Sequence, residues 1–112
     1  MMAKATIRTF VLALSALGAA SVAPAADLKA GEAKVKEVCQ ACHGVDGNSQ
    51  NVDYPKLGGQ YPDYLAKALR DYKSGARKNP IMAGFAGTLS SADIDNVAAY
   101  YAAQPAVLVT RH

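Results

Sequence analysis

Two cysteines and a histidine in the pattern C-x-x-C-H limit what this chain can fold around. Cys39 and Cys42 lie three positions apart, and His43 follows directly. On a helical turn this spacing brings both thiols to one edge of a flat macrocycle and directs the imidazole toward its centre. The sequence contains no other cysteine, so both thiols are available to one cofactor. The pattern therefore predicts covalent attachment of one haem c, with His43 as a ligand of its iron.

A C-x-x-C-H pattern has three alternatives to haem attachment. A thioredoxin-like pair would require a βαβ context, whereas the segments around Cys39 have helical patterns. A structural zinc site needs four ligands, and beyond the motif the chain offers only His112, at its C-terminal end. The third alternative is a chance occurrence of the motif. An export signal and a distal methionine in the same chain favour the haem over all three.

The N-terminal residues have the pattern of a secretory signal peptide. Lys4 and Arg8 provide positive charge, an apolar segment spans residues 10–23, and residues 23–25 fit the A-x-A cleavage pattern. The apolar segment is shorter than the about 20 residues that a membrane-spanning helix needs. We therefore expect cleavage and export, with an uncleaved N-terminal anchor as the alternative.

Cleavage would remove residues 1–25 and leave residues 26–112 as one small domain without a membrane span. In bacteria c-type haem is attached outside the cytoplasm, so export agrees with the motif and predicts a periplasmic protein. The full chain has a formal net charge of +3. The mature domain would be close to neutral, because two of the basic residues leave with the signal. Without a clustered basic patch, nucleic acid is not an expected partner.

The mature chain has helical patterns and no strand pattern, so we expect an all-α domain. The first helix is predicted over residues 28–43, with Asp27 as its N-cap. The second is predicted over residues 62–74, where a proline occupies the first position. The third follows the capping-box sequence at residues 90–93 and ends before Pro105.

Met82 is the first candidate for the second ligand of the iron. The other two methionines lie in the signal segment, so Met82 is the methionine of the mature domain. It lies in the second of two irregular segments, residues 44–60 and 78–88, which we expect to wrap the haem as loops. A thioether opposite a histidine suits an electron carrier of high potential. The alternatives are that Met82 fills a gap in the core or that His112 binds instead.

These pieces together resemble the class I cytochromes c, and within them the short bacterial cytochromes of the c553, c4 and c5 type. The matching residues are Cys39-Gln40-Ala41-Cys42-His43-Gly44, Tyr54-Pro55-Lys56-Leu57-Gly58-Gly59-Gln60, Tyr64-Leu65, Leu69, Gly75-Ala76-Arg77, Met82, Leu89-Ser90, Ile94 and Ala99-Tyr100-Tyr101. The resemblance implies a small monohaem fold in which the first and last helices cross. It also implies that the Pro55 carbonyl accepts the Nδ1 proton of His43.

The resemblance and the ligand set predict a one-electron carrier, not an enzyme. We expect redox proteins as partners, with a reductase as donor and an oxidase or another protein as acceptor. One alternative is a haem c subunit of a larger dehydrogenase complex. Another is a gas-binding or peroxidatic haem protein, if Met82 leaves the iron open. Arg77 and Lys56 are candidates to pair with the haem propionates, and Gln60 and Tyr64 are candidates to line the pocket.

Attachment through both thiols predicts a pigment that survives denaturation. Mass spectrometry should give the mass of residues 26–112 plus one haem, and acid-acetone treatment should leave the haem on the polypeptide. Replacing both Cys39 and Cys42 by alanine should leave mainly unfolded protein, because the small core then lacks its largest apolar group. Complete extraction of the pigment from the wild type would contradict covalent attachment.

Overall fold

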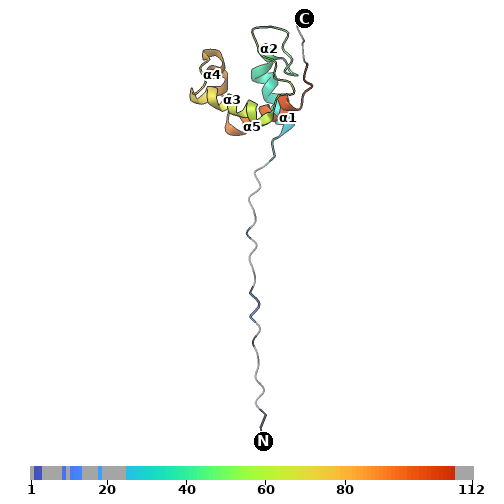
Figure 1. Ribbon diagram of the computed structural model, residues 1–112, viewed down its shortest axis with the longest axis vertical. Helices are drawn as coiled ribbons and strands as arrows, with labels where there is room; N and C mark the ends of the chain where they lie inside the picture. Colours follow the sequence, from blue (N-terminus) through green and yellow to red (C-terminus); the bar gives the residue numbers. More distant parts are fainter. Residues whose placement is uncertain (1, 4–8, 10, 14–17, 19–24, 108–112) are drawn as a thin grey trace.

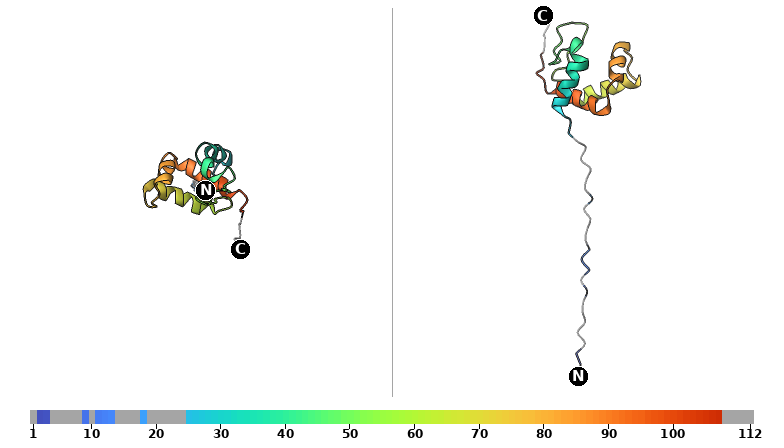
Figure 2. Two further views of the ribbon diagram at one scale, coloured as in Figure 1. Left: turned by 90° about the horizontal axis from the view of Figure 1, so that it is seen from above. Right: turned by 180° about the vertical axis from the view of Figure 1, so that it is seen from behind.

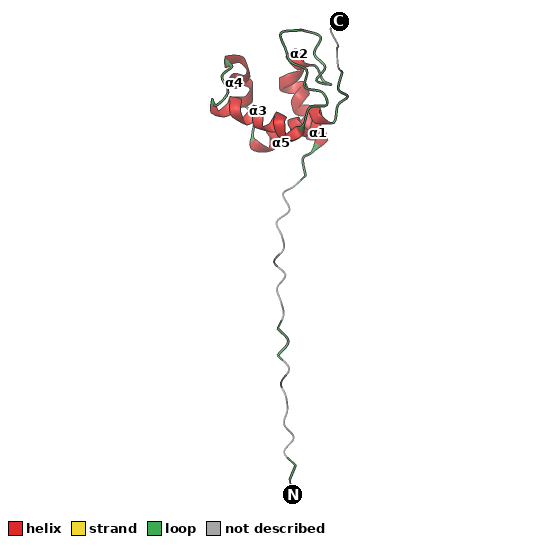
Figure 3. Cartoon of the chain, viewed as in Figure 1, coloured by secondary structure: helices red, strands yellow, loops and turns green. Residues whose placement is uncertain are grey.

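The computed structural model describes residues 25–107 throughout, together with residues 2–3, 9, 11–13 and 18. In this part of the chain the regular structure is helical and contains no strand (Figure 3). The all-α class expected from the sequence is therefore confirmed. His112 and most of the expected signal segment lie outside the described residues. Across the described ranges, no helix is both long and apolar enough to cross a membrane.

The first helical segment covers the predicted range but is not uniform. The helix α1 spans Leu28–Lys34, a π-helical turn η1 spans Val35–Cys39, and α2 spans Gln40–His43. The sequence predicts a continuous α-helix here, because the apolar spacing does not reveal a single widened turn. Such π turns are frequently found at functional sites. In this chain the widened turn ends at the first cysteine of the motif.

Both ends of this segment are capped, and Asp27 is the N-cap that the sequence predicts. The Asp27 carboxylate accepts hydrogen bonds from the backbone N–H groups of Lys29 and Ala30, which stabilises the first turn. At the other end Gly44 has a φ of 79°, a left-handed conformation that glycine adopts without steric cost. The chain therefore leaves the helix directly after His43 and turns into the long loop that contains Pro55.

Two further helices agree with the sequence in position and caps. The helix α3 spans Pro62–Ser74 and ends at Gly75, which has a φ of 85°. The helix α5 spans Ser91–Ala102. Its N-terminus has the expected capping box, in which Ser90 and Asp93 each accept a hydrogen bond from the other's backbone N–H at 3.0 Å.

The segment of residues 78–88 is not a loop, so this part of the prediction was wrong. It contains the helix α4, which spans Pro80–Gly87. The Asn79 side chain caps this helix by accepting from two backbone N–H groups, and Pro80 is favourable at the first position. The glycines suggested irregular backbone, but a glycine inside a helix costs only about 1 kcal/mol, and a good cap offsets a cost of that size.

α1 and α5 cross at very short range, as the resemblance implied. A Cβ atom at Gly31 would lie only 2.2 Å from the carbonyl oxygen of Asn96. The same region is joined by a hydrogen bond of 2.8 Å from the Asp27 backbone N–H to the Asn96 side-chain oxygen. In Figure 1 the first helical segment stands upright, and α5 lies across its lower end.

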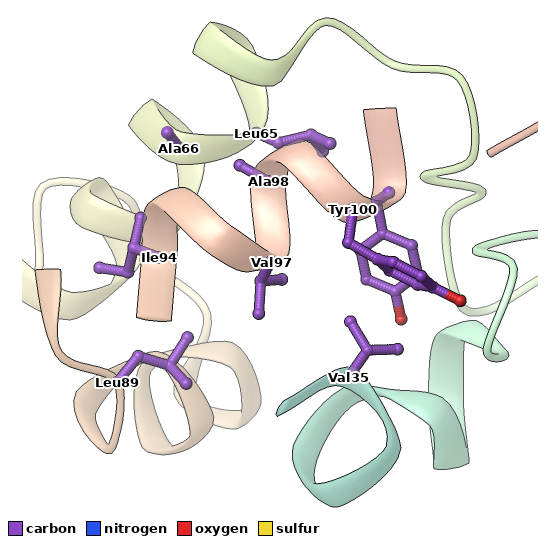
Figure 4. Packing of buried hydrophobic residues seen from close by; sticks show 9 residues of the cluster. Val35, Leu65, Ala66, Leu89, Ile94, Val97, Ala98 and Tyr100 are labelled. Carbon is purple, nitrogen blue, oxygen red and sulfur yellow. The ribbon is translucent and has the colours of Figure 1, made fainter. Parts of the chain in front are cut away.

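The core forms on both sides of α5. Figure 4 shows Ala98 on the side of Leu65 and Ala66 of α3. Val97 points instead toward the space between Leu89 and Val35. The residues of α5 that are buried in this core include Ile94, Val97, Ala98 and Tyr101.

The close crossing predicts opposite effects for two glycine substitutions. Gly31→Ala should lower the free energy of unfolding by about 1 to 3 kcal/mol, because the added methyl group meets backbone atoms. Gly84→Ala, in α4, is the matched control, because beyond the adjacent backbone of its own helix nothing lies within 4 Å of a Cβ at that position. It should be neutral or stabilise by up to about 1 kcal/mol. Urea unfolding of both holoproteins measures the difference, and equal effects would contradict the crossing.

Candidate haem site

One cavity collects the residues that the sequence predicted for haem binding. It has a volume of about 360 Å³ and is lined by residues of η1, α2, α3, α4 and α5 and of the loop after α2. Cys39, Cys42, His43, Pro55 and Met82 all line it. Figures 1 and 2 show α2 and α4 on opposite sides of the domain, with α3 and α5 running between them. Residues far apart in the sequence therefore meet at this cavity.

His43 is held in a defined orientation at the end of α2. It is only 7% exposed, and its Nδ1 lies 2.9 Å from the carbonyl oxygen of Pro55. A carbonyl oxygen can only accept, so Nδ1 carries the proton and donates this bond. The other ring nitrogen, Nε2, is then the one available to a metal. This is the hydrogen bond that the family resemblance implied.

Cys39 and Cys42 form no disulfide bond, and both side chains are partly buried. Burial raises the pKa of Cys39 to about 11, and the nearby charge of Lys34 opposes this shift only in part. A thiol with this pKa stays protonated at neutral pH. A structural zinc site needs four ligands, and within the described residues no group of three or more His, Cys, Asp or Glu side chains is placed to hold a metal ion. The apolar surroundings of Cys39 suit a thioether.

Met82 enters the cavity from the first turn of α4. Its side chain is partly buried, and its backbone N–H donates to the Asn79 side-chain oxygen at 3.1 Å. The cap therefore fixes the backbone that carries the thioether. The sequence placed Met82 in a loop, whereas a capped helix presents the sulfur with less loss of conformational entropy.

The remaining wall of the cavity is largely apolar, with charged groups in addition. Its aliphatic residues are Val38, Leu57, Leu65, Ala68, Leu69, Ile81, Ala86, Leu89, Val97 and Ala98. Lys56, Arg77, Gln60 and Tyr64, the weaker candidates from the sequence, also line it. The Arg77 guanidinium carbon lies 4.7 Å from the centre of the Tyr72 ring, which holds this positive charge beside the cavity. Two thiols, an oriented imidazole, a thioether and apolar walls fit a covalently attached haem with two protein ligands.

Two residues that organise the loop after His43 were not identified from the sequence. Asn48 is only 7% exposed, and its amide donates to the carbonyl oxygens of Asp46 and Pro105. The Tyr101 hydroxyl donates to the carbonyl oxygen of Gly44 at 2.9 Å. The sequence suggests only a polar loop residue and a packing aromatic at these positions. Their partners Pro105 and Gly44 are each 57 positions away, so no local pattern reveals them.

Comparison with known proteins gives the family. Residues 26–100 match the family model described as cytochrome C oxidase, cbb3-type, subunit III. The chain belongs to the cytochrome c family. The resemblance expected from the sequence is thereby confirmed, and membership in this family implies covalently bound haem c with iron.

Individual relatives differ in how much of their length the chain covers. Cytochrome c-554(548) of Halomonas halodenitrificans is 42% identical over 83 residues, which cover 71% of this chain and 99% of that protein. The thiosulfate dehydrogenase electron acceptor of Thiomonas intermedia is 40% identical over 92 residues, which cover 81% of this chain and 42% of that protein. Reduced cytochrome c4 from Pseudomonas stutzeri has a TM-score of 0.67 and 43% identity over 72% of this chain and 47% of that one. The chain spans about half the length of the cytochrome c4 relatives that it matches.

The burial of Asn48 predicts that its amide supports the loop beside the cavity. Asn48→Ala should lower the free energy of unfolding by about 1 to 3 kcal/mol, because the carbonyl of Pro105 loses its donor. Asn51→Ala is the control, since Asn51 is an exposed loop amide whose side chain accepts one local bond from Asp53. It should cost less than about 1 kcal/mol. Chemical denaturation of the holoproteins compares the two, and an equal loss in both would refute the role of Asn48.

Proposed function

We propose that this chain carries single electrons by means of one haem c held by Cys39 and Cys42, with His43 and Met82 as ligands of the iron. The observation that supports this most directly is that His43, oriented by Pro55, lines the same apolar cavity as Met82. When bound, the haem supplies an iron that gains or loses one electron. A single C-x-x-C-H motif in the sequence supports the number of one haem.

The residues of the chain have separate tasks in this proposal. The two cysteines prevent the cofactor from dissociating, since thioether bonds do not exchange. The Pro55 carbonyl holds the Nδ1 proton of His43, which fixes the ring and raises the basicity of Nε2. The thioether of Met82 would serve as the second ligand of the iron and would favour its reduced form. The aliphatic wall excludes water, which also affects the potential.

The proposed context is the periplasm of a bacterium. We infer that residues 1–25 are a cleaved signal and that residues 26–112 form the mature electron-transfer domain. The charged, apolar and A-x-A portions of the N-terminal sequence support this inference. The proposed partners are redox proteins, namely a reductase that supplies the electron and an oxidase or other protein that accepts it.

A second candidate function is a haem c subunit bound permanently to a dehydrogenase. It is favoured by the similarity to a protein named as the electron acceptor of thiosulfate dehydrogenase. The two functions share the same cofactor site and differ in quaternary structure. Recovery of the native protein as a monomer would support the free carrier, whereas stoichiometric purification with a dehydrogenase would support the subunit.

Ligation by Met82 predicts a closed iron. The ferric protein should have the weak near-infrared band that arises from sulfur bound to iron, and the ferrous protein should bind carbon monoxide poorly at neutral pH. Met82→Ala should abolish the band, lower the reduction potential and admit exogenous ligands, because the sixth position is then open. Met82→His should lower the potential while the site stays closed.

Gly84→Ala is the control for this experiment. Gly84 lies in the same helix as Met82, and an added methyl group there has no neighbour within 4 Å. The variant should keep the band and the resistance to carbon monoxide. Rapid stoichiometric binding of carbon monoxide by the wild type would exclude the carrier and favour a gas-binding or peroxidatic protein.

A further inference from the structure

Tyr101 connects the last helix to both ends of the loop that follows the haem-binding motif. Its side chain is 1% exposed, and its hydroxyl donates to the carbonyl oxygen of Gly44 at 2.9 Å. Gly44 is the residue directly after His43. The backbone carbonyl of Tyr101 accepts the N–H of Gly59 at 3.0 Å. One residue of α5 therefore holds the loop of residues 44–59 where it begins and where it ends.

The interior of this loop is packed against the same side chain. A Cβ atom at Gly47 would lie 2.7 Å from Cδ1 of the Tyr101 ring, so the backbone rests directly on the aromatic ring. The Gly47 carbonyl accepts the N–H groups of Leu57 and Gly58 at 2.7 and 3.1 Å, which closes the loop on itself. Pro55 lies within this closed segment, shortly before Leu57. Its carbonyl is the acceptor for His43 Nδ1.

We propose that Tyr101 is a positioning residue for the iron ligand, because its hydroxyl holds the backbone after His43 and so maintains the hydrogen bond between His43 and Pro55. The proposal rests on the proposed function in one respect, namely that His43 binds the iron. Donation from Nδ1 to a carbonyl makes Nε2 more basic, and a more basic imidazole favours ferric over ferrous iron. Tyr101, which also lines the cavity, would then influence the reduction potential through the hydrogen bond of His43.

The adjacent Tyr100 offers a matched comparison. Its ring lies 5.8 Å from the Tyr101 ring, and it is also buried in the core. It is not among the residues that line the cavity, and its hydroxyl makes no hydrogen bond within the described part of the chain. Removal of either hydroxyl leaves the aromatic ring in place. Only the Tyr101 hydroxyl is expected to affect the loop after His43.

The experiment compares the holoproteins of Tyr101→Phe, Tyr100→Phe and Ile94→Val with the wild type. Ile94 is a buried residue of α5 outside the cavity, and its loss of one methylene provides a purely structural destabilisation of about 1 kcal/mol. Two quantities are measured. The first is the reduction potential, and the second is the exchange rate of the His43 Nδ1 proton by NMR of the ferrous protein.

Tyr101→Phe should raise the ratio of ferrous to ferric protein at a fixed electrode potential by about threefold or more, because His43 becomes less basic. The His43 Nδ1 proton should exchange about tenfold faster, since the loop that supplies its acceptor is released. Tyr100→Phe and Ile94→Val should change neither quantity by more than about twofold. In the wild type, the Tyr101 hydroxyl proton should itself exchange slowly, which tests the Gly44 hydrogen bond without any substitution.

Equal shifts in Tyr101→Phe and Ile94→Val would show a general loss of stability and overturn the proposal. Unchanged potential and exchange in Tyr101→Phe would overturn it as well, as would rapid exchange of the Tyr101 hydroxyl proton in the wild type. These outcomes are separate from a failure of the proposed function. That failure would appear in the wild type as the absence of covalent haem or as an iron that His43 does not bind.

Discussion

The close contact between α1 and α5 at Gly31 is the interaction on which the rest of the structure depends. The backbone of Asn96 occupies the space that a side chain would need, so the two helix backbones lie in direct contact. The crossing sets where the C-terminal end of the first segment lies relative to α5. His43 and Gly44 thereby come within reach of Tyr101, although 57 positions separate Gly44 from that tyrosine. Both the core and the cavity follow from this arrangement.

The cavity forms because the first helical segment and the pair α3–α4 pack around the central helix α5. The first helical segment and α3 pack against different sides of α5, and α4 packs against α3 (Figures 1 and 4). The apolar surfaces of these helices line a common cavity of about 360 Å³. A domain of this size has a small core, so an apolar cofactor held there contributes to folding as well as to chemistry. Membership in the cytochrome c family accords with this dual role.

The two axial candidates are held by different kinds of local structure. His43 ends the α-helical turn that follows the widened turn, and the carbonyl of Pro55 orients its ring. Met82 begins a helix whose cap fixes its backbone. Each side chain is therefore placed by a helix terminus and not by a flexible segment. Such placement limits reorganisation when the charge of a site changes, which is what an electron carrier needs.

The sequence by itself determined the helices with strong local signals and the chemistry of the motif. Asp27, the capping box at Ser90 and the glycines after two helices act on their immediate neighbours, so their effects can be predicted without the fold. The helix α4 was missed because its glycines suggested irregular backbone, although Asn79 caps the helix. The sequence also named every residue proposed for haem binding, and only Pro55 needed the family resemblance.

Only the tertiary structure decided the contacts between distant segments. The crossing at Gly31, the bonds of Asn48 to the C-terminal segment and the hydroxyl of Tyr101 on Gly44 have no periodic or compositional pattern. Each depends on two backbones meeting at a distance that is set by all the packing between them.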